Sequence, residues 1–238
     1  MTIDFSGRNV VVTGATGELG LAVAARLVRA GAVCHAPARE GARLGKLESL
    51  GPGVRIARGV EVGEERSVAA FYAGLPSLWA SIHCAGGFEA SPFVDATLEG
   101  LQRLLSGNAV SCFLCAREAA RKMLAAPESA EGRGRIVNVT AQAAVEPRLG
   151  AGKVAYAASK AVVATLTVAA GEELARSGIW VNAVAPSILD TPANRSAMPT
   201  ADFSRWPKVE EVAETIAFLA SPQNLATRGA LVPVYGRT

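Results

Sequence analysis

The sequence has 238 residues, half of them hydrophobic, and this length suits one domain with a single sizeable core. Its 24 basic and 21 acidic side chains leave a formal net charge of +3 without any block of like charges, which argues against a nucleic-acid-binding surface. The apolar runs are shorter than the roughly 20 residues of a membrane span, and the N-terminus lacks the pattern of a secretory signal. We therefore expect one cytoplasmic domain over residues 1–238 that does not cross a membrane.

Short β-rich runs alternate along the chain with stretches of helical periodicity. Leu19, Val23 and Leu27 recur at four-residue intervals, which is typical of a helix with one apolar face. Runs such as NVVVT and RIVNVT are continuously apolar, as expected for strands covered on both faces. The alternation predicts an α/β fold, with a seven-stranded, mostly parallel sheet and helices on both faces. The predicted strands span 9–13, 33–38, 54–60, 80–85, 135–140, 179–185 and 230–235.

A glycine-rich turn joins the first predicted strand to the first helix. Gly14 would allow a tight turn, Gly17 would allow a pyrophosphate to approach the backbone, and Gly20 would let the helix pack closely. The helix N-terminus adds free N–H groups and a positive dipole. Without a GKS or GKT ending, a nucleoside triphosphate site is not expected. The turn predicts a dinucleotide site on a Rossmann fold, with Thr16, Glu18 and Leu19 also at the cofactor.

The end of the second strand indicates which dinucleotide is bound. An acidic residue there would hold a ribose hydroxyl, whereas an arginine would hold the 2′-phosphate of NADP. Here Arg39 follows the small residue Ala38, and a guanidinium can give a phosphate two N–H bonds. We expect NADP(H) to be preferred over NAD(H). The alternative is that Arg39 is a solvated charge and Glu40 holds the ribose.

Tyr156 and Lys160 stand four residues apart in a predicted helix, so both side chains project from one face. A phenol has a pKa of about 10 and becomes a better acid when a nearby cation stabilises its phenolate. Surface helices often carry this spacing by chance. Here, however, the helix follows RIVNVT, in the half of the sheet that would face a nicotinamide.

At this point the chain resembles the short-chain dehydrogenase/reductase family over nearly its whole length. The matching segments are TGATGELG, HCAGG, GNAVSCF, RIVNVT, YAASK and VNAVAPSILDT. The resemblance implies that Tyr156 is the general acid, that Lys160 lowers its pKa and holds the ribose, and that Asn108 supports a water. It also implies that Thr191 meets the nicotinamide carboxamide. Further cofactor contacts would come from Ala85, Gly86, Pro186 and Ile188.

Two departures from the family pattern bear on the substrate. The middle glycine of the turn is displaced, and the family's catalytic serine falls at Ala141, which cannot donate a hydrogen bond. Thr140 should point to the other side of the strand, and Gln142 is a possible substitute. Both departures resemble the dihydropteridine reductase subgroup, as does the segment LDTPANRSAMPTADFSRW. Residues 186–207 would form a lid that brings Phe203 and Trp206 to a flat substrate.

Three functions remain open from the sequence. The first is reduction of a dihydropteridine-like or other conjugated small molecule, and the second is reduction or oxidation of ordinary ketones and alcohols, including 3-oxoacyl substrates. The third is a catalytically silent sensor or scaffold that binds NADP. The resemblance also implies a homodimer or homotetramer built on the helices near 101–124 and 155–174. No metal site is expected because His35 and His83 are isolated, and Cys112 and Cys115 are predicted to be buried apolar residues.

Overall fold

The computed structural model describes residues 3–238 as an α/β domain around one seven-stranded sheet. The strand order is β3-β2-β1-β4-β5-β6-β7, and each neighbouring pair is parallel. The order reverses between β1 and β4, which creates the crevice where open α/β sheets bind their ligands. The strands are β1 (Asn9–Thr13), β2 (Val33–Ala38), β3 (Val54–Arg58), β4 (Ala80–His83), β5 (Gly134–Val139), β6 (Ile179–Pro186) and β7 (Leu231–Val234).

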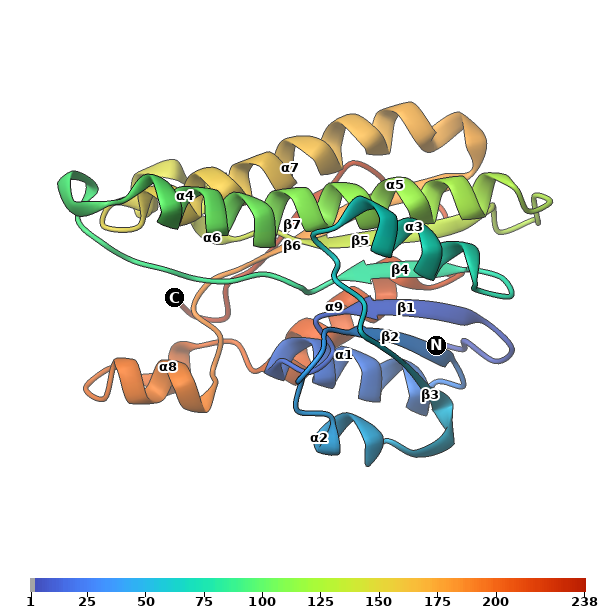
Figure 1. Ribbon diagram of the computed structural model, residues 1–238, viewed down its shortest axis with the longest axis horizontal. Helices are drawn as coiled ribbons and strands as arrows, with labels where there is room; N and C mark the ends of the chain where they lie inside the picture. The colour runs from blue at the N-terminus through green and yellow to red at the C-terminus, as the bar shows by residue number, and fades with distance from the viewer. Residues whose placement is uncertain (1–2) are drawn as a thin grey trace.

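Helices cover both faces of the sheet (Figure 1). Helices α1 (Glu18–Arg29) and α9 (Val209–Ala220) pack against each other on one face, while α3 (Glu65–Ala73), α5 (Ser111–Leu124) and α7 (Val154–Leu174) cover the other. The shorter helices are α2 (Gly45–Glu48), α4 (Leu98–Leu104), α6 (Gln142–Val145) and α8 (Pro192–Ala197). Helical turns η1 to η6 span Gly51–Gly53, Phe93–Asp95, Leu105–Val110, Pro147–Gly150, Ala175–Ser177 and Phe203–Arg205.

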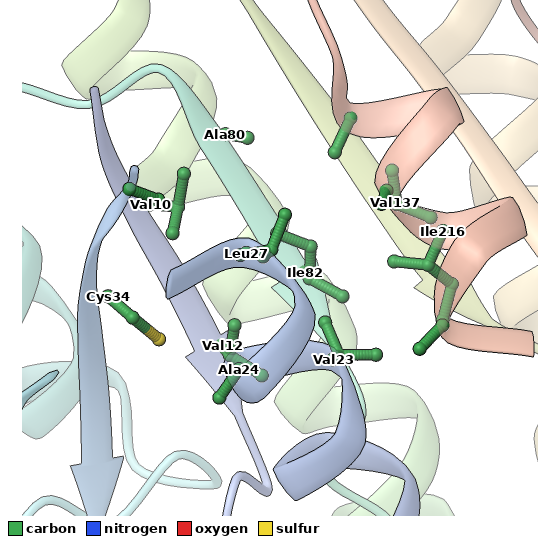
Figure 2. Packing of buried hydrophobic residues seen from close by; sticks show 14 of the residues in the cluster. Val10, Val12, Val23, Ala24, Leu27, Cys34, Ala80, Ile82, Val137 and Ile216 are labelled. Carbon is green, nitrogen blue, oxygen red and sulfur yellow. The ribbon is translucent and has the colours of Figure 1, made fainter. Parts of the chain in front are cut away.

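The sheet divides the core into two hydrophobic clusters. One lies under α1 and α9, where Val23 and Leu27 from α1 meet Val12 and Ile82 from the strands (Figure 2). The other lies under α3, α5 and α7. Central strands therefore contribute apolar side chains to both faces, which explains their continuous apolar sequences.

The predicted architecture is confirmed, with differences at the element ends. Strands β1 and β2 have the predicted bounds, whereas β3 and β4 end two residues earlier than expected. The sheet is wholly rather than mostly parallel. The segment 186–207, expected to be irregular, contains α8 and the turn Phe203–Arg205. Thr191 begins α8 by accepting a hydrogen bond from the Asn194 N–H, and Pro192 suits the first helical position.

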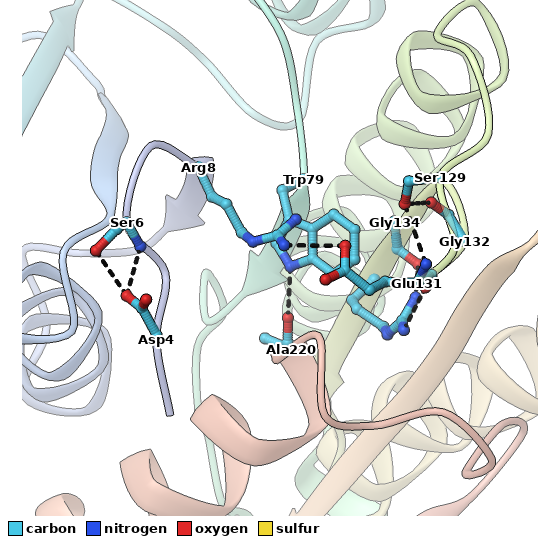
Figure 3. A network of polar contacts seen from close by, with 10 residues as sticks. Asp4, Ser6, Arg8, Trp79, Ser129, Glu131, Gly132, Gly134 and Ala220 are labelled. Carbon is cyan, nitrogen blue, oxygen red and sulfur yellow. Dashed lines mark hydrogen bonds and ion pairs between the residues drawn. The ribbon is translucent and has the colours of Figure 1, made fainter. Parts of the chain in front are cut away.

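The amino end of the sheet is closed by stacked arginine and tryptophan side chains. The Arg8 guanidinium lies 4.0 Å from the Trp79 ring centroid and bonds Glu131 at 3.1 Å, and the Trp79 indole N–H bonds the Ala220 carbonyl (Figure 3). Fully buried Arg135 has its guanidinium carbon 5.0 Å from the centroid of Trp79. Burial lowers the pKa of Arg135 to about 10. This end of the sheet is structural, since the crevice lies at the opposite end.

Helix α7 is unusual in its length and apolar composition. With the following turn it spans Val154–Ser177, long and apolar enough by those criteria alone to cross a membrane. One face of the helix packs on β6, where the Lys160 ammonium donates to the Val139 carbonyl of neighbouring β5, and 33% of its apolar window is buried.

Candidate active site

The turn after β1 has the geometry that its glycines predict. Gly14 has a φ of +66°, a left-handed conformation that favours glycine. A Cβ on Gly20 would lie 2.2 Å from the Gly14 carbonyl oxygen, so only glycine lets α1 begin this close to the turn. The Gly17 N–H donates to the same oxygen at 3.0 Å. The displaced middle glycine is therefore compatible with a closed, compact turn.

The N-terminus of α1 is free to receive an anion. Gly17 is its N-cap and supplies no side-chain hydrogen bond to the first turn, so the first N–H groups stay available for phosphate oxygens. Thr16 and Gly17 are exposed, and Leu19 is partly buried. Glu18 points to the side and pairs with Lys46 at 3.0 Å. The turn therefore fits the pyrophosphate of a dinucleotide.

The loop after β4 joins this turn to the predicted catalytic residues. The Ala85 N–H donates to the Thr13 hydroxyl at 3.2 Å, which links the ends of β1 and β4. A Cβ on Gly86 would lie 2.4 Å from Asn108 Oδ1 and 3.4 Å from Lys160 Nζ. Gly86 is thus the point at which the cofactor loop meets both side chains.

Asn108 is buried and held from two sides. It lies in a π-helical turn, Leu105–Val110, between α4 and α5, and such bulges are frequent at functional sites. Its Oδ1 accepts from the Gly87 N–H at 2.8 Å, and its Nδ2 donates to the Gly87 carbonyl and to the Ser159 hydroxyl. Ser159 precedes Lys160, so Asn108 connects the loop after β4 to the helix of the predicted acid.

Tyr156 and Lys160 occupy successive turns of α7, as predicted. Burial raises the pKa of Tyr156 to about 12. It lowers the pKa of Lys160. In this structure the Lys160 ammonium donates at 2.8 Å to the Val139 carbonyl and burial dominates at Tyr156, so the lowering of the phenol pKa by Lys160 stays a prediction for the protein with its cofactor bound. The phenol is therefore a proton-bearing group at neutral pH.

No hydroxyl replaces the missing serine. Ala141 is buried at the start of α6. The Thr140 hydroxyl donates to the Lys160 carbonyl at 2.8 Å, and so it is engaged away from the serine position, as the strand alternation predicts. Gln142 is partly exposed and its amide lies 3.4 Å from the Glu146 carboxylate.

The residues predicted to hold the other parts of the cofactor follow β2 and β6. Arg39 is exposed directly after β2, and no side-chain hydrogen bond or ion pair holds it among residues 3–238. Pro186 is buried as the last residue of β6, Ile188 is exposed, and the Thr191 hydroxyl caps α8. All three lie at or after the carboxyl end of β6, on the side of the crevice, but their contacts with a cofactor stay predictions.

The predicted lid has a fixed base. Asp190 and Lys208 form a parallel bridge, and the Asp190 N–H donates to the Pro207 carbonyl at 2.9 Å, while α8 stands away from the sheet (Figure 1). Trp206 is only 7% exposed, and its ring centroid lies 5.0 Å from that of Phe203. In this conformation Trp206 anchors the segment, and its contact with a substrate stays a prediction. Phe203 is the partly exposed member of the pair.

Phe88 is a site residue that the sequence analysis missed. Its ring packs edge-on against Tyr156, with centroids 4.9 Å apart and planes at 72°, although Phe88 is 66% exposed. Its place directly after HCAGG was the available clue. Ser159 was also missed, although it lies within YAASK.

Comparison with known proteins identifies the family of the chain. A model of the short chain dehydrogenase family matches residues 8–202. The chain belongs to this family. It is 36% identical to cis-4-hydroxycyclohexanecarboxylate dehydrogenase of Sinomonas cyclohexanicum, covering 98% of this chain and 96% of that protein. It is 28% identical to the NAD⁺-dependent 2-dehydro-3-deoxy-L-rhamnonate dehydrogenase of Sphingomonas sp., covering 92% and 90%.

The structural comparison agrees. A short-chain type dehydrogenase/reductase from Mycobacterium ulcerans superposes with a TM-score of 0.87 at 28% identity, covering 99% of this chain and 90% of that one. This member of the short-chain dehydrogenase family is accordingly an NAD(P)-dependent oxidoreductase. Neither relative named above is a pteridine reductase, and one is named for NAD⁺. The pteridine subgroup and the preference for NADP therefore stay hypotheses.

Proposed function

We propose that the protein interconverts a secondary alcohol and the corresponding ketone, with Tyr156 as the acid and base. The observation that carries this proposal is the close approach of Asn108 and Lys160 to Gly86, where both side chains would meet an added Cβ, because it brings the dinucleotide loop to the helix that bears Tyr156. The relative from Sinomonas, named for cis-4-hydroxycyclohexanecarboxylate, adds support. The nicotinamide, when bound, supplies or accepts the hydride.

The chain's own residues handle the proton. In the reducing direction the neutral phenol of Tyr156 donates to the substrate oxygen, and a raised pKa keeps that proton in place until the oxygen becomes basic. Lys160 carries a cation next to the loop, and burial makes it release a proton more readily. Asn108 holds Gly87 and Ser159 so that loop and helix keep their spacing.

We further propose NADP(H) as the preferred nucleotide, residues 186–207 as a lid, and a homo-oligomer in the cytoplasm. Arg39 supports the first assignment because its guanidinium is free for a phosphate. Exposed apolar residues on the outer faces of α5 and α7, such as Phe113 and Val162, support the assembly.

Ala141 favours a second candidate, the reduction of a conjugated substrate such as a quinonoid dihydropterin. An electron-poor C=N–C=C system needs less polarisation than a ketone, so the loss of one donor would matter less. Steady-state kinetics of the unaltered protein and Ala141→Ser on cyclohexanone and on a quinonoid dihydropterin separate the two. If the protein is a ketone reductase, the unaltered protein already turns over cyclohexanone. Turnover of the dihydropterin alone would reverse the order of the candidates.

A catalytically silent protein is the remaining alternative. Tight NADPH binding without turnover of either substrate would support it and overturn the proposed chemistry. Tyr156→Phe is the matched control for a protein that binds NADPH without turnover, because it removes only the hydroxyl of the proposed acid and leaves the nucleotide turn unchanged.

A further inference from the structure

We propose that Phe88 forms an apolar wall of the substrate site and selects alcohols and ketones whose reacting carbon lies in an apolar ring. The inference rests on the proposed function. Phe88 contacts the ring of the catalytic phenol and is still largely exposed. A molecule that receives a proton from Tyr156 must come within about 3 Å of its hydroxyl, and hence next to the free surface of Phe88.

The backbone beside Phe88 is fixed, so the wall is preorganised. The Gly87 N–H and carbonyl are both bonded to the side-chain amide of Asn108, at 2.8 and 3.1 Å. Because Asn108 is itself buried, the position of the next residue is set relative to the catalytic helix. A preorganised aromatic surface loses little entropy when a ligand packs on it.

The neighbouring side chains make this part of the loop apolar. Phe93, Val94 and Leu98 follow on the same segment and are 73%, 88% and 63% exposed. Exposed apolar side chains gathered on one segment are typical of a ligand or partner site. Glu89, the nearest charge in sequence, is paired with Arg103. The next charge along the chain is the exposed Asp95, seven positions after Phe88.

These contacts discriminate between substrate skeletons. An aliphatic ring can place C–H groups against the Phe88 ring and gain both burial and aromatic contact. A linear polyol would bring hydroxyl groups against the same surface, where they lose water without gaining a partner. Phe88 should therefore favour cyclohexanol-like substrates over sugar alcohols.

Phe88→Ala tests the inference, with Phe218→Ala as the control. Phe218 is an exposed phenylalanine of α9, on the other face of the sheet, and among residues 3–238 no aromatic contact joins it to Tyr156. We expect Phe88→Ala to lower kcat/KM for cyclohexanol about tenfold, mainly through KM, and to leave sorbitol unchanged or slightly improved. Phe218→Ala should change neither value. Equal losses on both substrates, or a loss confined to kcat, would make Phe88 a support for Tyr156 and overturn the inference.

A binding measurement keeps this inference separate from the proposed function. Cyclohexanone with NAD(P)⁺ forms a pair that cannot react, so calorimetry can report its affinity without turnover. Phe88→Ala should weaken cyclohexanone about tenfold and leave nucleotide affinity unchanged. An unchanged cyclohexanone affinity would refute the role of Phe88. If the unaltered protein oxidises neither alcohol, the proposed function fails, and this binding result still decides the role of Phe88.

Discussion

The Thr140 hydroxyl donates a hydrogen bond to the Lys160 main-chain carbonyl at 2.8 Å, and Lys160 returns a bond of the same length from its ammonium to the Val139 carbonyl. The end of β5 and the turn of α7 that carries Lys160 are thereby joined twice within two residues. All of these groups are buried or partly buried, and there a polar atom without a hydrogen-bond partner would destabilise the folded protein.

Thr140→Val should lower the free energy of unfolding by about 1–2 kcal/mol, because the shape is kept while the Lys160 carbonyl loses its donor. Urea denaturation measures the change, and Thr140→Ser, which keeps a hydroxyl, is the control. We also expect a lower kcat in Thr140→Val, since the turn that carries Lys160 loosens. Equal stability of the two variants would show that the bond contributes nothing.

A buried chain of hydrogen bonds crosses the sheet beneath the catalytic helix. Asn138 Nδ2 donates to the Thr167 hydroxyl at 2.9 Å, so its Oδ1 must accept from His83 Nδ1, 2.7 Å away. His83 Nε2 then accepts from Ser81, which lies 2.8 Å from the Tyr72 hydroxyl. This arrangement requires a neutral imidazole, and burial lowers the pKa of His83 from 6.5 to about 4.

The protein should lose stability as the pH falls from about 6.5 to about 4. In this range the unfolded chain protonates His83, whereas the folded protein keeps its imidazole neutral. The stabilisation that His83 gives the folded protein is therefore complete above the pKa of the unfolded chain and is lost as the pH falls to the pKa of the folded protein. The loss is on the order of 3 kcal/mol. Denaturation of the unaltered protein and His83→Gln across this range isolates the effect from other groups. Parallel stability curves would contradict it.

Tyr156→Phe should lower turnover by roughly 10² to 10⁴ while nucleotide affinity is kept. The pH dependence gives a second check. Because burial raises the pKa of Tyr156 to about 12, the phenol stays protonated from pH 7 to 9, so ketone reduction should be flat there. Alcohol oxidation needs the phenolate and should rise about tenfold per pH unit. A plateau of oxidation near pH 7 would show that Lys160 lowers the pKa in the working complex.

Arg39→Ala should weaken NADPH binding by roughly tenfold or more and leave NADH nearly unchanged, because a charge-assisted contact is worth about 1.5–3 kcal/mol. Titration calorimetry with both nucleotides checks this. Arg29→Ala, an exposed arginine at the far end of α1, is the matched control. If the unaltered protein binds NADH as tightly as NADPH, the assignment of NADP is wrong.

Hydrogen exchange within residues 191–205 should slow when nucleotide and cyclohexanone are both added, as expected for a closing lid. Asp190 provides an internal reference, since its N–H is already bonded to Pro207 at the base of the segment. Unchanged exchange in 191–205 would make this segment ordinary surface.

The sequence by itself determined the features that depend on local chain geometry. Continuous apolar runs predicted β1 and β5, the glycines after β1 defined the phosphate turn, and the four-residue spacing put Tyr156 and Lys160 on one helix face. Only the tertiary structure decided which groups these residues meet. Trp206 is buried, and the carbonyl of the preceding residue, Arg205, accepts a hydrogen bond from the Arg237 N–H near the C-terminus. Phe88 reaches Tyr156 from a loop 68 positions earlier in the chain. Burial and contact arise from segments remote in sequence, which no local pattern records.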